Sequence, residues 1–321
     1  MTDSQKLSSA VLAAVLLLLA AFPFMASAFG LDFYIGVVRR IMIFALAAAS
    51  LNIILGYGGM VALGHAGFVG VGAYTVVALS DAGVVSAWVL WPAALVVAGL
   101  VAAAIGAVSL RTQGVYFIMI TLAFAQMLYF VFVSLRKYGG DDGYNIATRP
   151  GLGLGLDSAH EPTLYWVVLA LVVLVLWFFN RAMQSRFGHA LAGIRDNETR
   201  MRALGYPVYR LQLAAFVMAG SAAGLAGALL AANNSFISPS SMHWTQSATL
   251  VVMVVIGGLG RRWGGVVGAA IWLVLEEVLK LQTDYWHLPL GALLIGIALY
   301  APKGVSALLD AKKAKTKRSA A

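Results

Sequence analysis

The chain has 321 residues, of which 61% are hydrophobic and only 11% are charged. Because ordinary soluble domains carry about 25% charged residues, too few polar side chains remain to cover a surface that faces water. The composition therefore excludes a soluble enzyme, a disordered chain and a nucleic-acid-binding domain, and it predicts an all-α polytopic membrane protein. In a soluble protein the net charge of +9 would suggest nucleic acid as a partner. Here the basic residues lie in short segments between apolar runs, so anionic lipid and a cytoplasmic face explain the positive charge, and we expect a lipid bilayer and no nucleic acid as partner.

Cysteine is absent from the sequence, which excludes disulfides, thiolate metal ligands and cysteine nucleophiles. The five histidines are scattered, and no pair has the spacing of metal ligands, so we expect no metal site. The sequence also has no phosphate-binding P-loop, nucleophile elbow or zinc-protease motif. We therefore expect a chain that binds no cofactor and catalyses no reaction of its own.

Long uncharged runs predict about ten membrane helices, some of them broken or re-entrant. A helix that crosses the hydrocarbon needs about 20 residues, so the runs over 41–80 and 211–260 each hold two elements. We treat residues 1–321 as a single transmembrane domain, with N-terminal helices over 7–180 and C-terminal helices over 211–302.

The N-terminus allows two interpretations. Lys6, an apolar stretch and the sequence Ala26-Ser27-Ala28 resemble a secretory signal with its cleavage site. However, the apolar stretch is longer than the roughly 7–15 residues of such a signal, and Asp3 cancels the charge of Lys6. We favour an uncleaved first helix, with cleavage as the alternative.

A glycine-rich motif begins at Leu51 and includes Gly56-Tyr57-Gly58-Gly59. Glycine in a helix costs about 1 kcal/mol relative to alanine, so three glycines in four residues predict an unwound helix. Unwound backbone at membrane depth lies inside protein or beside water, where its carbonyls become ligand groups. His65 follows this break, and it either satisfies freed backbone groups, which we favour, or contacts the transported molecule. The candidate pathway residues are Asn52, Tyr57, Gly58, Gly59, His65 and Gln126.

Basic residues gather in segment 181–210 and in the tail 303–321. Cytoplasmic loops carry an excess of Lys and Arg, so both segments, and with them the C-terminus, are expected in the cytoplasm. Segment 136–161 lies one crossing earlier and is expected outside. Arg39 and Arg40 do not fit, because they also fall outside if every element crosses fully. One of the elements that follow them is therefore expected to be broken or re-entrant.

Segment 181–210 is patterned as a short amphipathic helix at the membrane face. Its apolar residues Leu191, Ile194, Met201 and Leu204 fall on one helical face, and charged residues flank them. Gly205 and then Pro207 predict the end of this helix. The helix can rest on lipid or in the groove of a partner protein, and its acidic residues favour protein.

Two further clusters precede the C-terminus. A second glycine cluster over 257–268 contains Arg261 and Arg262, and it is either a second helix break or, as we favour, a tight cytoplasmic turn anchored by these arginines. Glu276 lies in an apolar helix, where a charge suggests function. Lys280 four residues later favours a simple ion pair instead.

Several motifs, taken together and in order, resemble the LivM-type permeases of branched-chain amino acid ABC importers. The motifs lie at 51–73, 111–125, 139–143, 186–205, 257–260 and 301–304. Met60, Ala62 and Gln126 depart from the residues usual in that family, so permeases for urea or short amides stay as an alternative. A self-sufficient secondary transporter is the rival class, and an integral-membrane enzyme is disfavoured.

The resemblance implies a multi-pass permease of the bacterial inner membrane that translocates branched-chain or related amino acids. It implies a LivH-like second permease, two cytoplasmic ABC ATPases that bind ATP and Mg²⁺, and a periplasmic substrate-binding protein. ATP binding then closes the ATPase dimer and pushes the coupling segment 181–210 of this chain. The residues implied in ATPase coupling are Arg195, Asp196, Glu198, Ala203, Leu204 and Gly205.

Overall fold

The computed structural model describes residues 3–30, 32–146, 150–151, 161–283, 285–300 and 304–305, so most of the basic tail 303–321 lies outside the described residues. The α-helices are α1 (Asp3–Ala28), α2 (Asp32–Asn52), α3 (His65–Asp81), α4 (Ala87–Ser109), α5 (Val115–Ser134), α6 (Glu161–Met183), α7 (Arg186–Asp196), α8 (Glu198–Ala203), α9 (Val208–Asn234), α10 (Trp244–Gly257), α11 (Gly264–Gln282) and α12 (His287–Tyr300). The smaller elements are η1 (Ile53–Tyr57), η2 (Arg136–Tyr138), β1 (Tyr144–Asn145), β2 (Phe236–Ile237), η3 (Gly140–Asp142) and η4 (Pro239–Met242).

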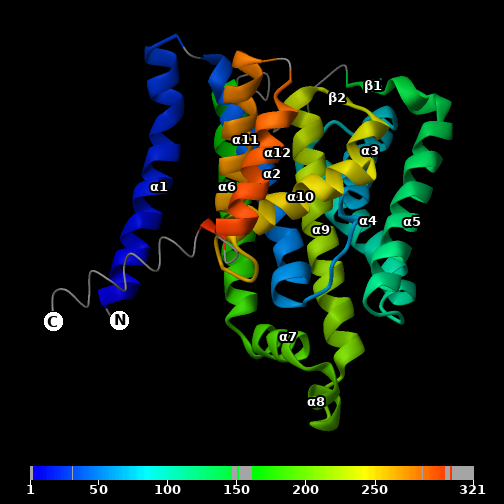
Figure 1. Ribbon diagram of the computed structural model, residues 1–321. Coiled ribbons are helices and arrows are strands. Elements are labelled where there is room, and N and C mark those ends of the chain that lie inside the picture. Colours follow the sequence, from blue (N-terminus) through cyan, green and yellow to red (C-terminus); the bar gives the residue numbers. More distant parts are fainter. Residues whose placement is uncertain are drawn as a thin grey trace.

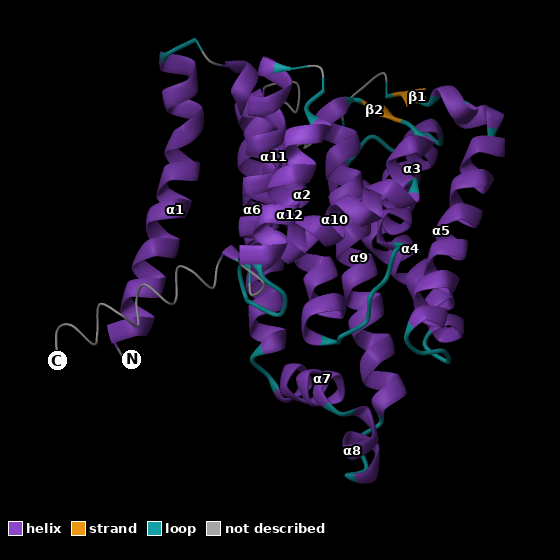
Figure 2. Ribbon diagram, viewed as in Figure 1, coloured by secondary structure: helices purple, strands orange, loops and turns teal. Residues whose placement is uncertain are grey.

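The expected all-α polytopic fold is confirmed (Figure 2). Within the described residues, five helices are long and apolar enough to cross a membrane; they are Phe33–Tyr57, Ala87–Ser109, Val115–Ser134, Glu161–Met183 and Val208–Asn234. Shorter apolar helices occur at Val15–Ala28, Trp244–Gly257 and His287–Gly296. The full number of ten membrane helices stays a prediction, because within the described residues these five alone meet the length and hydropathy of a membrane span.

Helix α9 is the central element of the bundle and packs against α2, α3 and α4. Small residues allow this close packing. A Cβ on Gly72 of α3 would overlap the carbonyl of Gly224, and a Cβ on Gly227 would overlap the carbonyl of Val69. Glycines spaced three and four apart on α9 therefore let neighbouring backbones approach closely, as small residues do in membrane helix pairs.

The loops lie at two opposite ends of the bundle (Figure 1). One end carries α7 and α8, and the other carries the antiparallel pair of β1 and β2. Helix α2 runs toward the α7–α8 end, widens into the π-helix η1 and breaks over 58–64. Helix α3 then starts beside Ser50 of α2, inside the bundle. The expected broken element after Arg40 is thereby confirmed.

Segment 181–210 contains two short helices, α7 and α8, so the prediction of one amphipathic helix is wrong. Asn197 separates them with an extended backbone at φ −161°, and its side-chain oxygen accepts a hydrogen bond of 2.9 Å from the Arg200 amide. An asparagine that caps a new helix competes with continuation of the old one. Leu204 is 66% exposed and does not share the buried face that Ile194 and Met201 form.

Gly205 ends α8 as predicted. Its φ of +82° is left-handed. The amide of Tyr206 donates to the Met201 carbonyl and that of Gly205 to the Arg202 carbonyl, at 3.1 Å and 3.0 Å. These two bonds make a Schellman motif, for which glycine is the preferred residue. Pro207 then precedes the first residue of α9.

Candidate functional site

Asn52, at the end of α2, joins the two glycine clusters of the sequence. Its side chain is buried, and its Oδ1 accepts a hydrogen bond of 3.0 Å from the amide of Gly260. Its Nδ2 donates to the carbonyl of Arg261 at 2.8 Å. One amide side chain thus satisfies both a donor and an acceptor of the α10–α11 turn. The favoured tight turn is present, and Asn52 holds its backbone.

Glycine is required where these clusters meet. A Cβ on Gly56 would overlap the amide nitrogen of Gly260, and a Cβ on Gly260 would lie 2.8 Å from the Gly56 carbonyl oxygen. Gly260 also has a φ of +68°, which L-residues with side chains rarely adopt. The break after α2 and the α10–α11 turn therefore form one closely packed backbone joint, which we call the glycine joint (residues 56–59 and 258–260).

Arg195 connects α7 to the glycine joint. Its Nη1 donates a hydrogen bond of 2.7 Å to the carbonyl of Gly56. That carbonyl lies within the π-helix η1. The aliphatic part of Arg195 also covers Gly59, where an added Cβ would lie 2.7 Å from its Cγ. Asp196 pairs with the same guanidinium at 3.1 Å. The predicted coupling segment therefore touches the unwound backbone directly.

Glu198 links the segment to a second part of the bundle. Its Oε1 accepts a hydrogen bond of 3.0 Å from Gln113 in the α4–α5 turn and pairs with Arg202 at 2.5 Å. A cavity of about 330 Å³ lies between these elements and the break; its lining includes Gly58, Gly59, Gln113, Arg195, Asp196 and Glu198. Ala203, Leu204 and Gly205 follow at the exposed tip of α8.

The candidate pathway residues do not gather at one place. Tyr57 and Asn52 border a small cavity of about 20 Å³, whereas Gly58 and Gly59 line the larger one. His65 is fully buried, and its Nε2 lies 2.8 Å from the Ser50 hydroxyl. His65 therefore hydrogen-bonds to a side chain of α2 and not to a backbone carbonyl freed by the helix break. Gln126 is half-buried on α5, and in the described part of the chain neither it nor His65 lines these two cavities.

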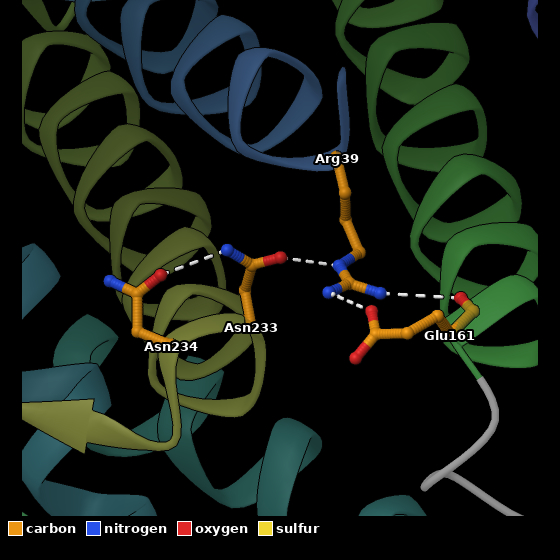
Figure 3. Close-up of polar contacts among 4 residues, drawn as sticks. All are labelled: Arg39, Glu161, Asn233 and Asn234. Atoms are coloured by element: carbon orange, nitrogen blue, oxygen red, sulfur yellow. Dashed lines mark hydrogen bonds and ion pairs between the residues drawn. The ribbon is translucent and has the colours of Figure 1, made fainter. Parts of the chain in front are cut away.

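Arg39 and Arg40 lie at the β1–β2 end, away from α7 and α8. Arg39 is 2% exposed, and its guanidinium reaches the Glu161 carboxylate at 2.7 Å and also donates to the Asn233 side chain (Figure 3). Arg40 pairs with Glu276 at 3.4 Å. These arginines do not act as free loop charges, because they are paired inside the bundle. A charge within an apolar run was the sequence signal for such a network.

Glu276 also forms the expected pair with Lys280, whose Nζ lies 2.6 Å from its Oε1. The one-turn spacing that predicted this contact holds in α11. Glu276 is therefore shared between a neighbour on its own helix and Arg40 on α2. The sequence indicated the first partner, and only the fold shows the second.

Comparison with known proteins identifies the family. Residues 33–300 match the family described as the permease component of the branched-chain amino acid transport system. The chain is 31% identical to the high-affinity branched-chain amino acid transport system permease protein LivM of Escherichia coli, over 95% of this chain and 75% of that protein.

Two relatives that match a smaller part of the chain are also permease proteins by name. A probable LivM permease of Methanocaldococcus jannaschii is 25% identical over 50% of this chain and 51% of its own length. The autoinducer 2 import system permease protein LsrC of Klebsiella pneumoniae is 30% identical over 46% of each chain. No solved structure matches the chain. The chain belongs to the family of permease components of branched-chain amino acid transport systems.

Proposed function

We propose that this chain is the translocating subunit of an ABC importer for branched-chain or related amino acids in the bacterial inner membrane. Residues 1–321 act as one transmembrane permease domain. The contact between Arg195 and the Gly56 carbonyl carries the proposal, because it joins an exposed helical segment to the π-helix that directly precedes the helix break within the bundle. A secondary transporter has no ATPase subunits to contact, so it does not require an exposed segment of this kind.

The α7–α8 segment is the part that meets the ATPases. Its tip presents Leu204 and Tyr206, which are 66% and 46% exposed, beside the charged residues of α8. Apolar side chains at an exposed tip suit the groove of a partner protein. In this orientation the α7–α8 end faces the cytoplasm, the β1–β2 end faces outside, and the C-terminus is cytoplasmic.

Two ABC ATPases then supply ATP and Mg²⁺, and a LivH-like second permease completes the membrane part. A periplasmic binding protein delivers the substrate to the β1–β2 end. When the ATPase dimer closes, it displaces α7–α8, and Arg195 transmits this displacement to the glycine joint. Asn52 carries it onward to the α10–α11 turn, since its amide bonds that turn.

Transport measurements test this function. The complete complex in proteoliposomes should accumulate leucine, isoleucine or valine only with internal ATP and the binding protein. Uptake by this chain alone, or uptake that follows an ion gradient and ignores ATP, would contradict the proposal. Competition by excess urea or acetamide distinguishes the amide alternative, because neither compound should reduce leucine uptake.

A further inference from the structure

A third cavity, of about 270 Å³, lies near the β1–β2 end, among α2, α3, α9 and α10. Its lining has an apolar wall and a polar wall. One wall is apolar and includes Ile43, Phe44, Leu230 and Leu250. The other is polar and includes Arg40, Asn234, Ser238 and Gln246. Pockets for small molecules combine an apolar lining with a few placed polar groups in this way.

Arg40 is the charged residue in the lining of this cavity, and its ion-pair partner, Glu276, also pairs with Lys280. The Nη2 of Arg40 lies 3.4 Å from Glu276 Oε1, and the Nζ of Lys280 lies 2.6 Å from the same oxygen. Glu277 follows on α11, but it pairs with neither cation among the described residues. Arg39 faces elsewhere, toward Glu161 and Asn233 (Figure 3). Two cations therefore share one carboxylate oxygen beside the cavity.

Two helix N-termini add to this positive potential. The first turn of α3 borders the cavity through Ala66, whose amide donates a hydrogen bond of 2.9 Å to the Ser247 hydroxyl in the first turn of α10. Gln246, in the same turn of α10, lines the cavity as well. Helix N-termini carry partial positive charge and favour an anionic group nearby. The guanidinium and both helix ends thus favour a carboxylate at this place.

We propose that this cavity binds one small aliphatic amino acid, with its carboxylate on Arg40 and its side chain against Ile43, Phe44 and Leu230. The inference rests on the proposed function, because it places a substrate site at the β1–β2 end of the pathway. Asn234 and Ser238 also line the cavity, and their side-chain oxygens are the acceptors that we assign to the ammonium group. The volume lies just below the roughly 300–1,000 Å³ of drug-sized pockets, which suits a molecule as small as leucine.

Equilibrium binding of radiolabelled leucine tests the site. The probe is added to the complex of both permeases and the ATPases in nanodiscs, without the binding protein. Arg40→Gln should weaken leucine binding at least tenfold. The matched control is Arg136→Gln, which removes an exposed arginine at the same end and away from the cavity, and it should bind as the unmodified complex does.

Two measurements do not depend on how well the Arg40 variant folds. Leucinamide keeps the ammonium and the side chain but lacks the carboxylate, so it should compete at least tenfold more weakly than unlabelled leucine for the unmodified complex. Ala47→Leu, which fills the cavity without changing charge, should also abolish binding. Equal competition by leucinamide, or leucine binding that survives both substitutions, would overturn the site.

Failure of the site differs from failure of the proposed function. If the complex shows ATP-dependent uptake but binds no leucine without the binding protein, the site is wrong and the importer function stands. If uptake ignores ATP while leucine binding still depends on Arg40, the importer function is wrong and the cavity is a substrate site of another kind of transporter.

Discussion

Replacing Arg195 with alanine should uncouple ATP hydrolysis from transport while the permease stays assembled. The substitution removes the 2.7 Å hydrogen bond from the guanidinium to the Gly56 carbonyl. Hydrogen bonds from charged groups contribute about 1.5–3 kcal/mol. The side chain is 41% exposed, so water competes for it, and we discount this contribution to about 1 kcal/mol. By the Boltzmann relation, that energy corresponds to about a fivefold weaker link between α7 and the glycine joint.

The assay is the ratio of leucine taken up to ATP hydrolysed in proteoliposomes that contain the complete complex. Arg195→Ala should lower this ratio about fivefold and leave basal ATPase activity unchanged. Arg136→Ala is the control, because it removes an exposed arginine outside segment 181–210. An unchanged ratio in Arg195→Ala, or an equal decrease in Arg136→Ala, would refute the role assigned to the link.

Three further substitutions test separate parts of the structure. Gly260→Ala places a side chain at φ +68° against a backbone carbonyl, and it should lower the free energy of unfolding by about 1–3 kcal/mol, measured by thermal unfolding in detergent. Glu161→Gln removes the carboxylate from buried Arg39; because Glu161 is 40% exposed, we expect a loss of about 1–2 kcal/mol in the same assay. Gly205→Pro is incompatible with φ +82° and should reduce co-purification of the ATPases without affecting membrane insertion.

A specific result would contradict each of these three predictions. Unchanged melting of Gly260→Ala would mean that the glycine joint is not closely packed. Unchanged melting of Glu161→Gln would mean that Arg39 needs no carboxylate partner. Full co-purification of the ATPases with Gly205→Pro would remove the tip of α8 from the docking surface.

The sequence predicted the features that depend on local energetics. Clustered glycines destabilise a helix wherever they occur, so the break that follows η1 could be predicted from the local sequence alone. The end of α8 was equally local, because it depends on the left-handed backbone of Gly205. Apolar runs likewise predicted an all-helical membrane protein, since only helices and closed barrels satisfy backbone groups in lipid.

The features that sequence reasoning missed depend on partners far away in the chain. The partners of Asn52 lie more than 200 positions later, and no local pattern connects an amide side chain with a turn at that separation. Arg39 was counted as a loop charge because its partner Glu161 is 122 positions away. The division of α7 from α8 was missed for another reason, since Asn197 fits the surface of a helix as well as its cap.

The glycine joint explains how a small external displacement can reach the interior. Where side chains lie between two backbone segments, they can rearrange and absorb a displacement, whereas two backbones in direct contact cannot. Gly56 and Gly260 touch without intervening side chains, and Asn52 and Arg195 fix them from both sides. Under the proposed coupling, movement of α7 should therefore displace the break after α2 and the α10–α11 turn together. Because α2 and α10 also border the cavity at Arg40, the same displacement should also reach the proposed substrate site at the opposite end of the bundle.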